Sequence, residues 1–156
     1  MSAAPIREAR PGDREALVAL LHDSFRTTWR PQVRAEAWRR WLEEDKAAAY
    51  VDAMSAEFLV AEADGAVAAM AHWRGDFVHA LHVHSRFRRR GLGSLLLRRA
   101  EADIAAAGHA SARLETDSFN RTSRSFYAAH GYCEVSSRPD AEWDSGLTTL
   151  LLEKRL

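Results

Sequence analysis

The chain has 156 residues, of which 47% are hydrophobic and 28% are charged, a composition ordinary for one soluble globular domain spanning residues 1–156. Lysine plus arginine number 22 and aspartate plus glutamate number 22, so the formal net charge is zero, which disfavours a nucleic-acid binder with a basic excess. The single cysteine, Cys133, excludes an intrachain disulfide and is compatible with a reducing compartment. Because the sequence shows neither an apolar leader nor an apolar run of about 20 residues, we expect a cytoplasmic protein with no membrane partner.

The first half of the chain predicts a strand, two helices and a hairpin. A short strand is expected at residues 6–9, and apolar residues at helical spacing predict a helix from Asp13 to about Phe25. After the interruption TTWRPQ, a second helix is predicted from about Arg34 to Val51. Two strand-like runs then flank Asp64-Gly65, which is the strongest short-range hairpin signal in the chain.

The second half alternates strands with helices. A strand at residues 77–83 precedes a helix that contains Leu92 and Ile104 and ends at Gly108. Further elements are expected in this order: a strand at 112–117, a short helix at 120–131, and strands at 132–135 and 147–156 around a polar loop at 138–146. This order predicts an α/β domain built around one sheet, with a parallel strand–helix–strand crossover from Phe77 to Asp117.

The stretch HVHSRFRRRGLGSLLL, residues 82–97, places arginines and two glycines between a strand and a helix. A helix start carries unpaired N–H groups and the positive end of the helix dipole, so it favours an anion. Gly91 and Gly93 lack a Cβ and allow backbone N–H groups to approach a ligand closely. The local chemistry favours a pyrophosphate at this turn, with a solvated arginine-rich helix start as the alternative.

Two other phosphate-binding motifs do not fit this stretch. The P-loop string G-x-x-x-x-G-K-[ST] does not occur in the chain. A dinucleotide fingerprint requires a third glycine at the position of Leu96. No spacing of histidine, cysteine and aspartate predicts a metal site.

Two segments together resemble the GCN5-related N-acetyltransferase (GNAT) superfamily. Residues 88–93, RRRGLG, are similar to its Q/R-x-x-G-x-G/A signature, and a second set matches its N-x-x-A/S-x-x-F-Y-x-x-x-G-F/Y segment: Asn120, Ser123, Phe126, Tyr127, Gly131 and Tyr132. The resemblance implies an α/β (α+β) fold: a single GNAT-like domain with a central mixed, mostly antiparallel sheet of about seven strands flanked by about four helices. In this family the fourth and fifth strands are parallel and splayed apart, which here means residues 77–83 and 112–117.

The resemblance implies acetyl-coenzyme A as co-substrate and no metal. Backbone N–H groups of residues 88–94 are expected to bind the pyrophosphate, and the backbone of residues 81–83 to bind the pantetheine arm. The resemblance thus implies these cofactor-binding residues: Leu81, His82, Val83, Arg88, Arg89, Arg90, Gly91, Leu92, Gly93, Ser94, Asn120, Ser123 and Tyr127.

Acetyl transfer from a thioester to an amine requires a deprotonated amine and benefits from protonation of the leaving thiolate. Tyr127 resembles the family's general acid. His79 is one candidate base: the string H-A-L-x-V-H-x-x-F-R-x-x-G-x-G-S resembles the arylalkylamine branch, in which a histidine at this place helps to relay the proton. Glu115 is another candidate base, because it lies five residues before Asn120, as does the base of the ribosomal-protein N-terminal branch. A mechanism that uses neither base stays open.

The acceptor is expected to be a small-molecule or peptide primary amine. The first two helices would form the acceptor wall, with Phe25, Trp29 and Trp73 as substrate-binding candidates, although core packing is an alternative for the aromatic residues. The acidic loop at 140–144 would attract a cationic amine or remain solvated. The sequence leaves a homodimer open, and the alternative function is a non-catalytic acetyl-CoA-binding sensor or scaffold module.

Overall fold

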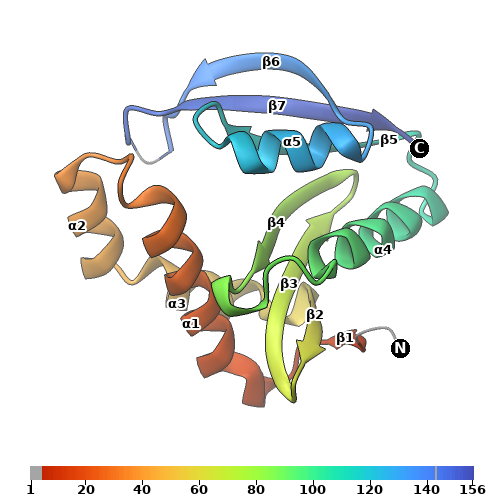
Figure 1. Ribbon diagram of the computed structural model, residues 1–156, viewed down its shortest axis with the longest axis horizontal. Helices are drawn as coiled ribbons and strands as arrows, with labels where there is room; N and C mark the ends of the chain where they lie inside the picture. The colour runs from red at the N-terminus through yellow and green to blue at the C-terminus, as the bar shows by residue number, and fades with distance from the viewer. Residues whose placement is uncertain (1–4, 143) are drawn as a thin grey trace.

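The computed structural model describes residues 5–142 and 144–156, which form a seven-stranded sheet with helices on both of its faces (Figure 1). The order of the strands in the sheet is β1-β2-β3-β4-β5-β7-β6. The strands are β1 (Ile6–Glu8), β2 (Phe58–Ala63), β3 (Ala66–Arg74), β4 (Phe77–Val83), β5 (Ser111–Asp117), β6 (Cys133–Pro139) and β7 (Thr148–Arg155). The α-helices are α1 (Arg14–Ser24), α2 (Ala35–Glu43), α3 (Lys46–Met54), α4 (Leu92–Ala106) and α5 (Arg121–Ala129).

The pairing of β4 with β5 is parallel, and every other neighbouring pair of strands is antiparallel. This parallel pairing is short, because only Phe77 with Arg113 and Val78 with Leu114 stand opposite each other. Both strands continue past this point without further pairing and so diverge toward their carboxyl ends. The predicted mixed sheet with a parallel, splayed fourth and fifth strand is therefore confirmed.

Helices cover both faces of the sheet because residues along the central strands alternate between two apolar clusters. In β3, Met70 packs in the cluster that contains Leu17 of α1. Its neighbours Ala69 and Ala71 pack in the cluster that contains Leu96 of α4. The three helices α1, α2 and α3 thus lie on one face of β2–β4, and α4 lies on the other (Figure 1).

Two local predictions are confirmed in detail. Asp64 and Gly65 both have positive φ angles, 52° and 76°, and Ala63 pairs with Ala66, so the β2–β3 connection is the expected two-residue hairpin. Helix α4 ends just before Gly108, whose φ of 97° is the left-handed conformation that commonly terminates a helix.

The predicted single helix from about Arg34 to Val51 is instead two helices, α2 and α3. Asp45 breaks the run because its φ of 41° is left-handed, and its carboxylate accepts a hydrogen bond of 3.2 Å from the backbone N–H of Ala48. The described residues therefore contain five α-helices rather than about four. Strand β6 is also longer than predicted and reaches Pro139.

Candidate active site

A cavity of about 950 Å³ lies at the amino-terminal end of α4, next to the carboxyl end of β4. Apart from Arg90, every residue that the resemblance assigns to cofactor binding lines this cavity. They are Leu81, His82, Val83, Arg88, Arg89, Gly91, Leu92, Gly93, Ser94, Asn120, Ser123 and Tyr127. Two motifs that are far apart in the sequence thus meet around one space, which we call the cofactor cavity.

The turn before α4 is shaped to present backbone N–H groups. Arg89 and Gly91 have φ angles of 66° and 78°, and Gly91 contributes no capping side chain at the start of the helix. The N–H groups of the first helical turn have no partner within a helix. A Cβ at Gly93 would be in ordinary van der Waals contact with Phe126, at 3.5 Å, and with Val83, at 3.6 Å. The turn is therefore a suitable cradle for a diphosphate.

The arginines near this turn have different surroundings. Arg88 lines the cofactor cavity and donates a hydrogen bond of 3.3 Å to the hydroxyl of Thr27, which lines the same cavity. Arg90 instead lies outside the cavity lining, where it pairs with Asp64 at 3.0 Å and covers the ring of Phe87. The guanidinium of Arg90 is thus engaged with the β2–β3 hairpin, while binding of the cofactor by the backbone N–H of Arg90 stays a prediction.

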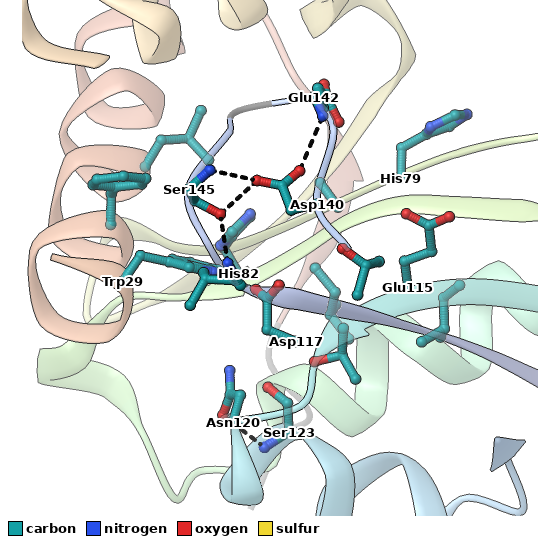
Figure 2. A pocket seen from close by; sticks show the side chains of 18 of the residues that line it. Trp29, His79, His82, Glu115, Asp117, Asn120, Ser123, Asp140, Glu142 and Ser145 are labelled. Carbon is teal, nitrogen blue, oxygen red and sulfur yellow. Dashed lines mark hydrogen bonds between the residues drawn. The ribbon is translucent and has the colours of Figure 1, made fainter. Parts of the chain in front are cut away.

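A second cavity, of about 380 Å³, lies between the α1–α3 side of the molecule and the diverging strands (Figure 2). We call it the acceptor cavity. Its lining combines aromatic side chains with carboxylates: Phe25, Trp29, Trp41, Tyr50, Tyr127, Glu115, Asp117, Asp140 and Glu142. The two cavities share six lining residues, which are Trp29, Leu81, His82, Asn120, Ser123 and Tyr127. The two cavities therefore adjoin at the shared residues.

Tyr127 is one of these shared residues and comes from α5. Asn120 caps this helix by accepting a hydrogen bond of 3.1 Å from the N–H of Ser123, which fixes the start of α5 beside both cavities. The ring of Tyr127 packs edge-on against Phe126, and its side chain is buried. Burial raises the pKa of Tyr127 above its ordinary value, so the phenol keeps its proton at neutral pH and is able to donate it.

His79 lines the acceptor cavity because β4 contains a bulge at this residue. Trp73 of β3 stands opposite Val78 and His72 stands opposite Ala80, which leaves His79 as the extra residue. Strict strand alternation would place His79 on the same face as Leu81 and Val83, and the bulge breaks this alternation. The bulge turns His79 toward the α1–α3 face, where its ring stacks on His72.

The two candidate bases differ in their surroundings. Burial, and then the neighbouring His72, lower the pKa of His79, so its imidazole is neutral over a wider range of pH. Glu115 also lines the acceptor cavity, but its carboxylate forms an ion pair with Arg138 at 3.0 Å. Figure 2 shows both side chains at the same end of the cavity, so the structure brings both candidates to the acceptor side.

His82 is the second histidine of β4 and lines both cavities. Burial lowers its pKa to about 4, so this side chain is neutral at physiological pH. Its ring lies edge-on to the indole of Trp29, at 6.0 Å between centroids. The His82 side chain therefore supplies neutral, aromatic surface where the two cavities join.

The profile of the acetyltransferase (GNAT) family matches residues 14–132, a segment that includes α1, the turn before α4 and the whole of α5. The chain belongs to the GNAT family. As a member of this family, the GNAT protein is an acyltransferase, and the reaction of its family is acetyl transfer. No curated protein sequence matches the chain at a significant level.

Solved structures have the same fold as this GNAT protein. A GCN5-related N-acetyltransferase from Rhodopseudomonas palustris superposes with a TM-score of 0.81 at 22% identity, covering 100% of this chain and 98% of its own. The PaiA N-acetyltransferase from Thermoplasma acidophilum, solved in complex with coenzyme A, gives 0.74 at 19% identity, with coverage of 99% and 100%. A ribosomal-protein-alanine N-acetyltransferase from Brucella melitensis gives 0.71 at 22%, with coverage of 97% and 99%.

Asp117, at the end of β5, was not identified from the sequence as a site residue. It lines the acceptor cavity, and its carboxylate accepts a hydrogen bond of 2.6 Å from the indole N–H of Trp29. Burial raises the pKa of Asp117, and the nearby carboxylates of Asp140 and Glu115 add to this effect. No sequence signal indicated that Asp117 lines a cavity, because a polar residue at the end of a strand is common.

The predicted acceptor-side residues separate into two groups. Phe25 and Trp29 line the acceptor cavity of the GNAT protein, and their role in substrate binding stays a prediction. Trp73 lines neither cavity and packs against the apolar clusters that include α4, so we do not place it in the acceptor wall. In the acidic loop, Asp140 faces the cavity while its carboxylate accepts hydrogen bonds from Ser145 (Figure 2).

Within residues 5–142 and 144–156, no group of three or more histidine, cysteine, aspartate or glutamate side chains is arranged to hold a metal ion. In the same part of the chain, no helix is both long and apolar enough to cross a bilayer.

Proposed function

We propose that this GNAT protein transfers the acetyl group of acetyl-CoA to a primary amine by direct attack of the amine. The observation that carries the proposal is the junction of the two cavities, at which Tyr127 lines both. A diphosphate held at the turn before α4 would place the rest of the coenzyme along β4, with its sulfur end near this residue. An amine in the acceptor cavity would approach the same place from the opposite side.

The residues present fit coenzyme A. The backbone N–H groups from Gly91 to Ser94 and the side chain of Arg88 would hold the diphosphate. The backbone of residues 81–83 lies at the diverging end of β4, where it would bind the pantetheine arm. When bound, the coenzyme supplies an acetyl group activated as a thioester.

Tyr127 is the proposed proton donor to the leaving sulfur. Its buried phenol keeps its proton at neutral pH, as its raised pKa requires. His79 or Glu115 is the proposed base that removes a proton from the amine, directly or through water, since both line the acceptor cavity. His79 has a neutral imidazole available, whereas Glu115 would have to act beside the guanidinium of Arg138.

The acceptor is proposed to be an amine that is cationic in solution and carries an apolar portion. Phe25 and Trp41 stack at 4.1 Å between ring centroids and form an apolar wall on one side of the acceptor cavity. Asp117 and Glu142 line the cavity as well and would attract an ammonium group. A small molecule and a peptide amino terminus both meet this description. Cytoplasmic location and a homodimer stay predictions of the sequence.

The proposal is tested by measuring release of free CoA thiol from acetyl-CoA with a panel of amines. The panel should contain arylalkylamines, polyamines, aminoglycosides, amino acids and peptides with free amino termini. Turnover that depends on one class of amine is the expected result. Binding of CoA measured by calorimetry, without turnover on any amine of the panel, would instead favour a non-catalytic acetyl-CoA-binding module. Absence of binding would overturn both functions.

A further inference from the structure

A chain of hydrogen bonds leads from the acceptor cavity to the surface beneath α3. The hydroxyl of Tyr50, in α3, is hydrogen-bonded to Nδ1 of His72 in β3. Nε2 of His72 lies 2.9 Å from Oε1 of Glu57, which belongs to the turn before β2. Glu57 accepts two hydrogen bonds from the guanidinium of Arg74, at 2.6 and 3.1 Å. The proposed mechanism uses none of these four side chains.

The two ends of this chain have different surroundings. His72 is 3% exposed and lies between Tyr50 and the stacked ring of His79, whereas Glu57 and Arg74 are largely at the surface. Tyr50 lines the acceptor cavity together with His79. The hydrogen bonds therefore connect Tyr50, which lines the acceptor cavity, through His72 to the ion pair of Glu57 and Arg74 at the surface.

Each hydrogen bond in the chain determines the direction of the next. An ionised carboxylate only accepts hydrogen bonds, so Nε2 of His72 must be the donor to Glu57. If the imidazole is neutral, it carries one ring proton, so Nδ1 of His72 accepts and the hydroxyl of Tyr50 is the donor. The one proton of Tyr50 is then committed to His72, and the phenol oxygen has only lone pairs to offer to the cavity.

We propose that Tyr50 binds the N–H group of the acceptor amine through its phenol oxygen, and that His72 and Glu57 hold Tyr50 in this acceptor-only state. Tyr50 is then a specificity-determining residue, and His72 and Glu57 are positioning residues that act through it. A group without a hydrogen to donate would leave this oxygen unpaired. That the ligand is an acetyl acceptor rests on the proposed function. The donor-to-acceptor direction of the hydrogen bonds from Tyr50 to Glu57 does not.

The ionisation states of Tyr50 and Glu57 agree with this direction. Burial raises the pKa of Tyr50, which keeps the phenol protonated. The hydrogen bonds from Arg74, and then from His72, lower the pKa of Glu57 to about 2, which keeps the carboxylate ionised. The titratable groups that surround His72 are Tyr50 from α3, Glu57 from the turn before β2 and His79 from β4.

The donor-to-acceptor direction of these hydrogen bonds is tested without any activity measurement. Nitrogen-15 NMR of the full chain at pH 8 distinguishes the tautomers of a histidine, and His72→Gln assigns the signal. We expect His72 to be neutral with its proton on Nε2. A proton on Nδ1, or a doubly protonated ring, would overturn the proposal, because His72 would then donate to Tyr50 and free its hydroxyl proton for the cavity.

The role in acceptor binding is tested with Tyr50→Phe and the matched control Tyr132→Phe. Tyr132 also donates a buried hydrogen bond, to Glu101 at 2.8 Å, but it lines neither cavity. Loss of a hydrogen bond to a cationic amine should raise the KM for the amine about tenfold in Tyr50→Phe, with kcat nearly unchanged. Tyr132→Phe should leave this KM within about twofold of the parent value.

The kinetic outcome separates this proposal from the proposed function. An unchanged amine KM in Tyr50→Phe would overturn the role of Tyr50 even if acetylation proceeds. Should the parent protein acetylate no amine, the proposed function would fail, and the inference would be judged on the His72 tautomer and on NMR titration with the amine panel. In that titration, a weaker amine affinity in Tyr50→Phe supports the role of Tyr50, and an equal affinity contradicts it.

Discussion

The indole N–H of Trp29 donates a hydrogen bond of 2.6 Å to Oδ2 of Asp117, a residue 88 positions later in the chain. Trp29 ends the helical turn that follows α1, and Asp117 ends β5. Trp29 lines both cavities and Asp117 lines the acceptor cavity, so this bond ties the two walls together beside the proposed site of reaction. The remaining oxygen, Oδ1 of Asp117, would offer a carboxylate oxygen to the proposed cationic acceptor.

Replacing this carboxylate should weaken binding of the acceptor. Asp117→Asn keeps an oxygen for Trp29 but removes a negative charge from the acceptor cavity, so we expect the KM for a cationic amine to rise about five- to tenfold. The affinity for CoA, measured by calorimetry, should not change. Asp103→Asn, which removes a carboxylate from a surface ion pair with Arg99, is the control and should alter neither quantity.

The same substitution should change how stability depends on pH. Because the pKa of Asp117 is raised on folding, the folded state holds this proton more tightly, and the contribution of Asp117 to the stability of the parent protein falls as pH rises from about 4 through the raised pKa. Asp117→Asn has no such proton. The free energy of unfolding of the variant minus that of the parent should therefore increase between pH 4 and pH 7 in urea titrations. A difference that stays constant or decreases would contradict the raised pKa.

Features that depend on neighbouring residues could be predicted from the sequence. Asp64-Gly65 forms the expected hairpin, and Gly108 terminates α4, because both signals reside in local backbone preferences. The turn at Gly91 and the tyrosine of α5 also came from short motifs, and the structure places Gly91 and Tyr127 around one cavity. Because Gly91 and Tyr127 line one cavity, the two motifs together support a single cofactor site, which neither motif establishes alone.

Features that depend on tertiary contacts could not be predicted. The bulge that moves His79 to the α1–α3 face is visible only in the pairing of β3 with β4. The bond between Trp29 and Asp117 joins segments that carry no common pattern. The left-handed Asp45 was missed for another reason: helical periodicity continues across it, and aspartate is not a strong helix terminator by sequence alone.

The conformation of Gly91 provides a test of the diphosphate cradle. A Cβ at this residue meets no atom within 4 Å, so Gly91→Ala acts through its φ of 78°, which costs an L-residue about 1–2 kcal/mol. Relaxation of this strain should turn the N–H groups away and weaken CoA binding about tenfold. Gly108→Ala is the matched control, because it has a comparable φ of 97° and open space at the other end of α4. Both variants should lose similar stability, but only Gly91→Ala should lose affinity for CoA.

Removing the phenol of Tyr127 tests the proton donor. In Tyr127→Phe the ring and its packing against Phe126 are retained, but the hydroxyl is lost. We expect kcat for acetyl transfer to fall about 10²-fold at saturating substrates, while CoA affinity stays within about twofold. Stopped-flow detection of thiol release would measure the effect. An unchanged rate would remove Tyr127 from the chemistry and leave it a packing residue.

The pH dependence of kcat/KM distinguishes the two candidate bases. A base must be unprotonated to act, so activity should fall as pH drops through its pKa. Because the pKa of His79 is lowered by burial, an acidic limb below about pH 6.5 is expected if His79 is the base. His79→Gln would then abolish that limb, and Glu115→Gln would preserve it while freeing Arg138. The reverse pattern would assign the base to Glu115. If both variants keep the limb, neither His79 nor Glu115 removes the proton.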